Sequence, residues 1–228
     1  MKITKAIVTA MKEEADIIIK KYNLTETLKK GTMTIFEWEC ESEDGTDKLV
    51  LVLAGIGKIC AATATTYLFE NYDIHKLINI GIAGNLGNVD IKVWDVFIPN
   101  TFIQHDMYLP FEWEHLNYAK APIFLEYAIW QNVDLIKFGL IMSWVCLTGD
   151  QFIDNPEKVV ELRDDHGADI CEMEAFAILS VAREYDALDK CVVIKAVSDG
   201  ADNEAKDAHM DNLEFAMNNS IIVLELVL

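Results

Sequence analysis

Arginine is almost missing from this sequence. Only Arg163 and Arg183 occur among 228 residues, and 38 acidic residues against 19 basic ones leave a formal net charge of −19. Surfaces that bind nucleic-acid phosphates or anionic membranes need clustered lysine and arginine. The composition therefore argues against nucleic acid and membranes as partners.

Paired cysteine motifs and long apolar runs are missing too. The five cysteines are odd in number, widely spaced and without any Cys-x-x-Cys motif. This is typical of reduced, packed thiols rather than of a disulfide or zinc framework. The chain contains no run of about 18 apolar residues and starts without a long apolar signal-like segment. We expect a cytoplasmic protein.

The phosphate-binding fingerprints of nucleotide-binding proteins are incomplete. Gly55-Ile-Gly-Lys58 resembles the end of a phosphate loop, but Val52 stands at the position of the first glycine and Ile59 at that of the Ser or Thr. The segment Gly81-Ile-Ala-Gly84 has the spacing GxxG instead of GxGxxG. These glycines still let a ligand approach the backbone closely, and a plain tight turn at 81–84 explains the pattern equally well.

The histidine motifs of hydrolases and zinc enzymes are incomplete as well. His105-Asp106 has neither a Gly-x-Ser-x-Gly elbow nor a His-Glu-x-x-His motif to complete a triad or a metal site. A local hydrogen bond explains such a pair better. We expect no metal and no cofactor.

The apolar pattern predicts a single α/β domain spanning residues 1–228. Hydrophobic residues make up 52% of the chain, and no linker or repeat interrupts it. Strand-like and helix-like segments alternate, which predicts a largely parallel or mixed sheet covered by helices. We expect strands at 3–9, 33–41, 49–54, 77–80, 93–103, 138–146 and 191–197, one helix ending near residue 22, and further helices at 59–70, 122–133, 156–166, 172–182 and 213–228.

Two segments are predicted as loops. Residues 107–113 are rich in aromatic side chains and could pack on the core, cover a pocket or form a subunit contact. Residues 202–211 are highly charged.

Two carboxylates stand at the head of an apolar helix that we expect to begin near Glu172. Acidic residues stabilise a helix N-terminus by about 0.3–1 kcal/mol, which would explain Glu172 without any function. Residues two apart on a helix point to nearly opposite sides. Glu172 and Glu174 are therefore not expected to share one role.

Two further acids lie where strands end. The apolar run 191–197 stops at Ser198-Asp199-Gly200, and ligands of open α/β sheets bind at the carboxyl ends of strands. Asp199 is thus a site candidate, although a turn aspartate that bonds its own backbone stays possible. Glu14 lies at a strand-to-helix junction from which it can reach over the same edge.

Six of these strand-end motifs, taken in order, resemble those of the 5′-methylthioadenosine/S-adenosylhomocysteine nucleosidases, a group within the nucleoside phosphorylase superfamily. The resemblance covers essentially the whole chain. The motifs are Ala10-Met-Lys-Glu-Glu14, Gly55-Ile-Gly-Lys58, Gly81-Ile-Ala-Gly84, Thr148-Gly-Asp-Gln-Phe-Ile153, Glu172-Met-Glu-Ala175 and Val197-Ser-Asp199.

The resemblance implies a three-layer αβα sandwich with a mixed central sheet, a homodimer, and hydrolysis of adenine nucleosides at the bond between adenine N9 and ribose. It implies that Asp199 protonates adenine N7, that Glu14 positions or deprotonates the water, and that Glu174 holds the ribose hydroxyls. Such groups suit a reaction that forms an oxocarbenium-like sugar. The implied substrate-binding residues are Ile56, Ala83, Gly84, Phe152, Ile153, Glu172, Met173 and Ser198, with Phe152 stacking on adenine and the backbone of Ile153 reading its edge.

The implied role of Asp199 requires a special environment. With an unperturbed pKa of ~3.9, an aspartate is protonated about once in a thousand at pH 7, which adds roughly 4 kcal/mol to the barrier. We therefore expect a dry site crowded with negative charge.

The chain departs from the family pattern at three positions. Ile82 replaces a common Ser or Thr, and Lys195 replaces a usual Arg, so that its charge stays but its bidentate fork is lost. An ungapped comparison puts His209 where the family often has an aromatic residue that covers the substrate.

Three other functions compete with adenine nucleoside hydrolysis. A phosphorylase of the same superfamily would use phosphate, which normally recruits Arg, but Arg163 and Arg183 lie in no matching motif and only Lys58 and Lys195 could substitute. A nucleoside-binding protein without catalysis would fit Ile82 and Lys195. A hydrolase of another purine nucleoside, such as futalosine, is the third.

Overall fold

The computed structural model describes residues 3–42, 45–87, 90–111, 113–126 and 144–228. It contains a mixed sheet in the order β2-β3-β4-β1-β5-β10-β9-β7-β8, with β11 paired to β5 and β6. The strands are β1 (Ile3–Thr9), β2 (Thr25–Lys30), β3 (Met33–Ser42), β4 (Gly45–Leu53), β5 (Ile74–Asn85), β6 (Val96–Phe97), β7 (Thr101–Gln104), β8 (Ile123–Phe124), β9 (Val145–Thr148), β10 (Ile170–Glu172) and β11 (Cys191–Asp199).

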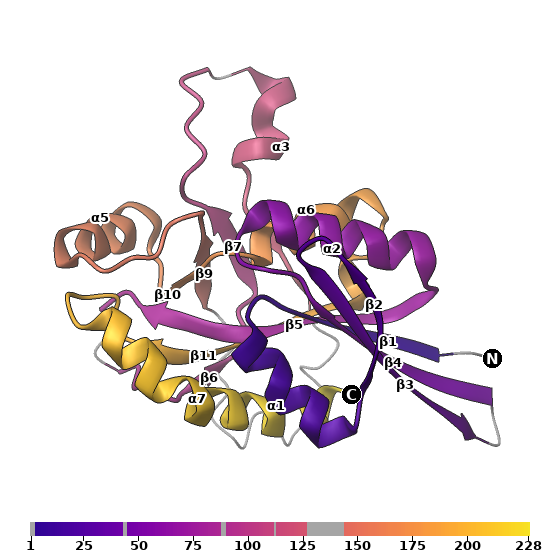
Figure 1. Cartoon of the computed structure of the whole chain (residues 1–228). Helices are drawn as coiled ribbons and strands as arrows, with labels where there is room; N and C mark the ends of the chain where they lie inside the picture. The colour runs from indigo at the N-terminus through magenta and orange to yellow at the C-terminus, as the bar shows by residue number, and fades with distance from the viewer. Residues whose placement is uncertain (1–2, 43–44, 88–89, 112, 127–143) are drawn as a thin grey trace.

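Helices cover both faces of this sheet. Figure 1 shows α1 and α7 on one face and α2 and α6 on the other, so the expected αβα sandwich with a mixed sheet is confirmed. None of the helices in the described part of the chain is long and apolar enough to cross a membrane. The helices are α1 (Lys12–Tyr22), α2 (Lys58–Asn71), α3 (Asn117–Lys120), α5 (Pro156–His166), α6 (Ala175–Glu184) and α7 (Ala205–Val227).

The centre of the sheet consists of parallel strands that are covered on both sides. β1 pairs in parallel with β4 and β5, and β5 pairs in parallel with β11. Continuous apolar runs are typical of such strands, because both faces need hydrophobic side chains. Every residue of β11 is buried, including the polar Lys195, Ser198 and Asp199. Polar side chains in this position need partners, and they find them at the carboxyl ends of the strands.

Gly84 is the point at which three segments meet. In the sheet it lies opposite Asp199 of β11 and opposite Cys171 of β10. A Cβ atom at this position would lie 3.1 Å from Asp199 Oδ1, 3.2 Å from Ala201 Cβ and 3.4 Å from Cys171 Sγ. The absence of a side chain at Gly84 lets these segments approach one another.

Several predicted elements have the predicted bounds because their ends carry strong local signals. The helix at 156–166 begins after Asn155, whose side chain accepts hydrogen bonds from the N–H groups of Glu157 and Lys158 at 2.8 and 3.3 Å. It ends at Gly167, which has a φ of 61°. An asparagine cap, a proline in the first turn and a left-handed glycine mark a helix from sequence alone.

The predicted start of the helix at Glu172 is wrong. Glu172 is the last residue of β10, and α6 begins at Ala175. The Glu172 carboxylate accepts hydrogen bonds from the N–H groups of Glu174 and Ala175 at 3.0 and 2.8 Å. It therefore caps the helix from outside instead of belonging to its first turn.

Other boundaries also differ from the predictions. β5 continues to Asn85, so 81–84 is strand rather than turn, because its edges pair with β10 and β11. The charged segment 205–211 is helical, since its charges lie on an exposed face while Ala205 is buried. Residues 123–124 form β8 instead of a helix, and the remainder of the predicted helix at 127–133 lies outside the described residues, as does 138–143 of the next predicted strand.

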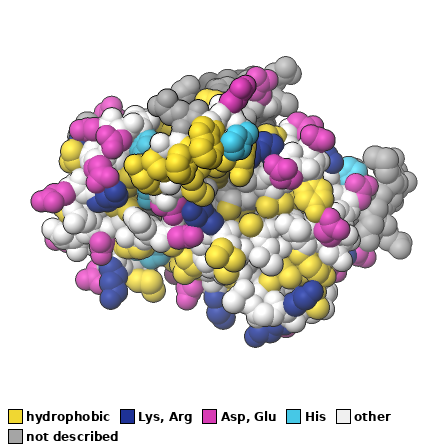
Figure 2. All heavy atoms as spheres, turned by 90° about the horizontal axis from the view of Figure 1, so that it is seen from above, with side chains coloured by type: hydrophobic (Ala, Val, Ile, Leu, Met, Phe, Trp, Pro, Cys, Tyr) yellow, Lys and Arg dark blue, Asp and Glu magenta, His cyan; other side chains and the backbone are white. Residues whose placement is uncertain are grey.

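Residues 107–111 and 113 of the aromatic segment belong to an arm that projects from the body of the molecule beside α3 (Figure 1), and residue 112 lies outside the described residues. The arm leaves large apolar side chains exposed, with Tyr108 at 84% and Trp113 at 56%. Figure 2 looks down on this side of the molecule, where hydrophobic side chains gather. These aromatic side chains therefore do not pack on the protein's own core.

Candidate active site

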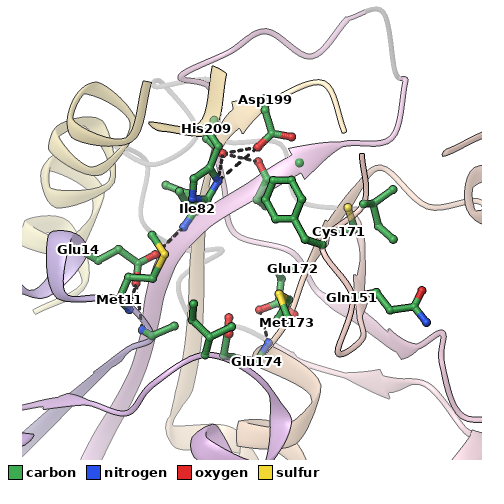
Figure 3. A pocket seen from close by; sticks show the side chains of 17 residues that line it. Met11, Glu14, Ile82, Gln151, Cys171, Glu172, Met173, Glu174, Asp199 and His209 are labelled. Atoms are coloured by element: carbon green, nitrogen blue, oxygen red, sulfur yellow. Dashed lines mark hydrogen bonds and ion pairs between the residues drawn. The ribbon is translucent and has the colours of Figure 1, made fainter. Parts of the chain in front are cut away.

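The carboxyl ends of the central strands surround a cavity (Figure 3). All eleven site residues expected from the sequence line it: Glu14, Ile56, Ala83, Gly84, Phe152, Ile153, Glu172, Met173, Glu174, Ser198 and Asp199. Ala10, Met11, Ile82, Gln151, Cys171 and His209 complete the lining. Four carboxylates, from three distant parts of the chain, thus face one space.

Glu14 reaches this cavity from the first turn of α1. Its carboxylate accepts hydrogen bonds from the backbone N–H groups of Ala10 and Met11, both at 3.0 Å, and of Ile82 at 3.2 Å. Burial raises the pKa of Glu14 above its ordinary value, although these hydrogen bonds and the charge of Lys195 act in the opposite direction. Glu14 is a fixed carboxylate with an increased affinity for protons.

Glu172 lies at the end of β10 and is held from three sides. The Thr148 hydroxyl donates to its Oε1 atom, the N–H groups at the start of α6 donate to both oxygens, and Lys195 Nζ lies 2.7 Å from Oε2. With its oxygens so engaged, Glu172 supports the cavity wall rather than presenting a free acid to a ligand.

Glu174 is the N-cap residue of α6 and points across to the start of α2. Its Oε1 atom accepts a hydrogen bond from the Gly57 N–H at 2.9 Å, and its Oε2 atom lies 4.0 Å from Lys195 Nζ. Gly57 has a φ of 93°, which favours glycine. Gly57 of the phosphate-loop-like segment thus binds a carboxylate of the protein itself.

Burial raises the pKa of Glu174 to about 7. Lys195 opposes this shift, while the negative charges of Glu172 and Glu14 add to it. With its pKa raised to about 7, Glu174 can exchange a proton near neutral pH.

Lys195 is the cation that the acids share. It is 1% exposed and comes from the middle of β11. Burial alone would lower its pKa, but the charges of Glu172 and Glu174 outweigh burial and raise the pKa above its usual value. Glu172 and Glu174 do not point to opposite sides of a helix as expected, because neither residue lies inside the helix and both face this lysine. Their contacts stay distinct, since Glu172 binds Lys195 closely and Glu174 accepts the Gly57 N–H.

Asp199 closes β11 and is 3% exposed. The Ser198 hydroxyl donates to its Oδ2 atom at 2.7 Å, and the Ala201 N–H donates to Oδ1 at 2.9 Å. Asp199 therefore bonds its own backbone, as the turn interpretation required, and also faces the cavity. A turn aspartate and a site residue are therefore compatible roles for Asp199.

An aromatic edge lies near this aspartate. The rings of Phe152 and His209 meet at a centroid distance of 5.5 Å and an interplanar angle of 79°. Phe152 is 45% exposed, whereas Ile153 beside it is buried. The cavity thus has a ring that can contact a flat ligand, together with a rigid backbone segment.

Some cavity residues carried no usable signal in the sequence. Cys171 lines the cavity beside Gly84, its partner across the sheet, and that contact depends on strand pairing. Ile82 lies inside the marked Gly81–Gly84 motif, but it contributes only its backbone N–H to Glu14, which any residue other than proline supplies. Ala10, Met11 and Gln151 also lie inside motifs that the sequence had marked.

The His105-Asp106 pair lies outside this lining. Asp106 binds Lys58 Nζ at 2.6 Å and accepts the Asp150 N–H at 2.8 Å. The Asp150 carboxylate in turn accepts the Lys58 N–H at 2.8 Å. These contacts fasten the loop after β9 to the start of α2.

Known proteins share this fold over nearly the full chain. The family model described as the phosphorylase superfamily matches residues 4–228. The chain is 30% identical over 223 residues to the 5′-methylthioadenosine/S-adenosylhomocysteine nucleosidase of Tolumonas auensis, covering 94% of both proteins. It is 31% identical over 238 residues to that of Bacillus thuringiensis, covering 96% of this chain and 97% of the relative.

A solved structure agrees with these matches. The Neisseria meningitidis 5′-methylthioadenosine/S-adenosylhomocysteine nucleosidase in complex with methylthio-immucillin-A has a TM-score of 0.80 and 27% sequence identity, covering 95% of this chain and 94% of that chain. The family model and the shared fold define a phosphorylase-superfamily protein. Within that superfamily, the chain belongs to the 5′-methylthioadenosine/S-adenosylhomocysteine nucleosidase family, which confirms the resemblance noted from its motifs.

The buried Glu174 makes the stability of the protein depend on pH. Its pKa rises from 4.5 to about 7 on folding, so its contribution is fully present below pH 4.5 and is lost as the pH rises through 7. Between pH 5 and pH 8, the free energy of unfolding should fall by about 2.5 kcal/mol more in the wild type than in Glu174→Gln, whose amide does not ionise. Urea denaturation at pH 5 and pH 8 measures the free energy of unfolding of both proteins.

The exposed Glu13→Gln is the control and should keep the wild-type dependence. If Glu174→Gln and the wild type lose stability equally between the two pH values, Glu174 does not take up a proton on folding.

Proposed function

We propose that this protein hydrolyses the N-glycosidic bond of adenine nucleosides and releases free adenine and the ribose derivative. The observation that carries the proposal is the convergence of buried Glu14, Glu174 and Asp199, each from a different strand end, on one cavity. The names of the relatives point to 5′-methylthioadenosine and S-adenosylhomocysteine as substrates. We add 5′-deoxyadenosine as a related substrate.

Asp199 is the proposed acid for the departing base. Protonation of adenine N7 lets the base accept the electron pair of the N9–C1′ bond as that bond breaks. The Ser198 hydroxyl and the Ala201 N–H hold the two carboxyl oxygens in place. Such fixed hydrogen bonds keep the group oriented throughout the reaction.

Glu14 is the proposed base for water. Three backbone N–H groups fix its carboxylate, and burial raises its pKa. A carboxylate whose pKa lies closer to the working pH removes a proton more effectively than an ordinary glutamate. Water attacks C1′, transfers one proton to Glu14 and becomes the new hydroxyl of the sugar.

Glu174 is the proposed partner of the ribose hydroxyls. Its Oε1 atom is anchored by Gly57, and Lys195 lies near Oε2. A negative carboxylate beside the sugar also stabilises the positive charge that develops on the ribosyl group. Phe152 supplies a stacking surface for adenine, and Ile153 supplies backbone groups at its edge.

Charge supports water over phosphate as the nucleophile. The lining contains the acids Glu14, Glu172, Glu174 and Asp199, which repel a phosphate dianion. The nearby lysines are engaged, Lys58 with Asp106 and Lys195 with Glu172.

The direct assay incubates purified protein with 5′-methylthioadenosine, with and without phosphate, and measures adenine and sugar products. Equal adenine release in both cases, with free methylthioribose, supports the proposal. Ribose-1-phosphate derivatives that require added phosphate would establish a phosphorylase, and binding without any adenine release would establish a binding protein. A panel with S-adenosylhomocysteine, 5′-deoxyadenosine, adenosine and futalosine identifies the preferred substrate.

We also propose that the protein is a cytoplasmic homodimer. The exposed aromatic side chains of the arm support this proposal, because Met, Tyr, Phe and Trp are enriched at subunit contacts. The double variant Tyr108→Ser/Trp113→Ser should then elute as a monomer in size-exclusion chromatography with light scattering. If the wild type and the double variant are both dimers, the subunit contact lies outside these two side chains.

Asp199→Asn tests the acid role. Asparagine keeps the size and the hydrogen bond from Ala201, but it has no proton to give to N7. Adenine release should drop by about 10²–10⁴-fold, while binding of a nucleoside, measured by calorimetry, stays within a few-fold. Retained turnover would remove Asp199 from this role, and the matched exposed variant Asp154→Asn should behave like the wild type.

Phe152→Ala tests the stacking role. Loss of one base-stacking ring removes about 1–3 kcal/mol of binding, so KM should rise roughly 5- to 100-fold while kcat changes little. Steady-state kinetics with 5′-methylthioadenosine separate the two parameters. Phe124→Ala, an exposed ring away from the cavity lining, is the control, and an unchanged KM in Phe152→Ala would contradict the role.

A further inference from the structure

His209 is the one cavity-lining residue that combines a titratable ring with contact to the proposed acid. It lies in the first turns of α7, and its side chain is 16% exposed. The ring Nδ1 atom lies 3.6 Å from Asp199 Oδ2 and 3.5 Å from Ser198 Oγ. Figure 3 shows His209 beside Asp199 at the same end of the cavity.

The surroundings of His209 hold it in this position. Asn212, one helical turn further on, donates its Nδ2–H to the Ser198 carbonyl at 3.0 Å. Trp94 Nε1 donates to Asn212 Oδ1 at 3.1 Å, which fixes the amide in turn. The edge-to-face contact with Phe152 limits the ring on its other side. α7 is therefore fastened to the end of β11 beside the histidine.

The Ser198 hydroxyl connects the two titratable groups. It donates to Asp199 Oδ2 at 2.7 Å and lies within reach of His209 Nδ1 at 3.5 Å. A hydroxyl can accept one proton while it donates another. The three groups form a continuous path from a partly exposed imidazole to a buried carboxyl.

The proposed reaction creates a need for such a path. Each turnover moves the Asp199 proton to adenine N7 and leaves the proton of the attacking water on Glu14. Asp199, which is 3% exposed, must then regain a proton before the next turnover. Glu14 approaches the cavity from α1 on another side (Figure 3), and its hydrogen bonds among the described residues lead to the N–H groups of Ala10, Met11 and Ile82 rather than to Asp199.

We propose that His209 is a positioning residue that returns the proton to Asp199 after each turnover; this rests on the proposed role of Asp199 as the acid. The imidazolium gives its Nδ1 proton to Ser198 Oγ while Ser198 gives its own hydroxyl proton to Asp199 Oδ2. His209 becomes neutral and takes a new proton from water, while Glu14 loses one proton to solvent. The balance of protons is thereby closed.

The charges around His209 suit this role. Among the described residues, Asp199 is the acid within ion-pairing distance of the ring. On α7 itself, Lys206 lies one turn earlier and is exposed, as is Asp202 in the preceding turn. The remaining titratable groups of the cavity are Glu14, Cys171, Glu172 and Glu174.

The test is the variant His209→Asn, whose amide can hydrogen-bond but cannot carry a proton. Rapid-mixing kinetics with excess 5′-methylthioadenosine should show a first turnover at the wild-type rate, followed by a steady state about 10-fold slower at pH 8. The deficit should shrink to within about 3-fold at pH 5.5, because direct protonation of Asp199 by solvent is faster there. Added imidazole should restore the steady-state rate and remove the burst.

His209→Gln is a second variant, chosen because Gln favours helices and so guards against unfolding of α7. His166→Asn, at the end of α5 and outside the cavity lining, is the matched control and should show neither burst nor imidazole effect. A steady state equal to that of the wild type at pH 8, or a slow one that imidazole does not change in either variant, would overturn the proposal. Asp199→Asn is measured in parallel to separate the proposed role of His209 from the proposed function. Retained turnover in Asp199→Asn contradicts the proposed function itself.

Discussion

The ion pair between Lys195 and Glu172 is the contact on which the rest of the site depends. Both side chains are almost fully buried and their charged atoms lie 2.7 Å apart. Removal of one partner from such a pair typically costs 3–5 kcal/mol, because the other charge stays buried without compensation. The pair joins β11 to β10, and Glu172 in turn receives the first N–H groups of α6. Glu174, the N-cap of that helix, is thereby held at the cavity.

The same lysine divides the acids of the cavity by role. Glu172 takes the close contact with Lys195, while Glu174, 4.0 Å from the same ammonium group, has a pKa raised to about 7. An arginine presents a planar fork that binds a carboxylate through two parallel hydrogen bonds, whereas lysine is a compact point charge. The close contact of Lys195 goes to Glu172, and Glu174 lies farther from the ammonium group.

Much of the molecule could be predicted from the sequence, since its signals are local. β1, β11 and α5 carry continuous apolar runs or strong caps, and the acids at their ends mark the edge of the sheet. The exposed edge strand β2 was not predicted, because its burial pattern does not alternate. The start of α6 was misplaced, since an acid before a helix and an acid in its first turn look alike in sequence.

The parts that escaped prediction depend on contacts between distant segments. Glu172 and Glu174 lie around Lys195 because β5 pairs with both β10 and β11. Cys171 lies close to Gly84 because of the register between β10 and β5. The position of His209 depends on how α7 docks beside Ser198.

The most direct test of the account is a crystal structure with a non-hydrolysable adenine nucleoside. We predict the base at Asp199 and Phe152 with the ribose hydroxyls at Glu174, and a nucleoside bound away from these three side chains would contradict the account.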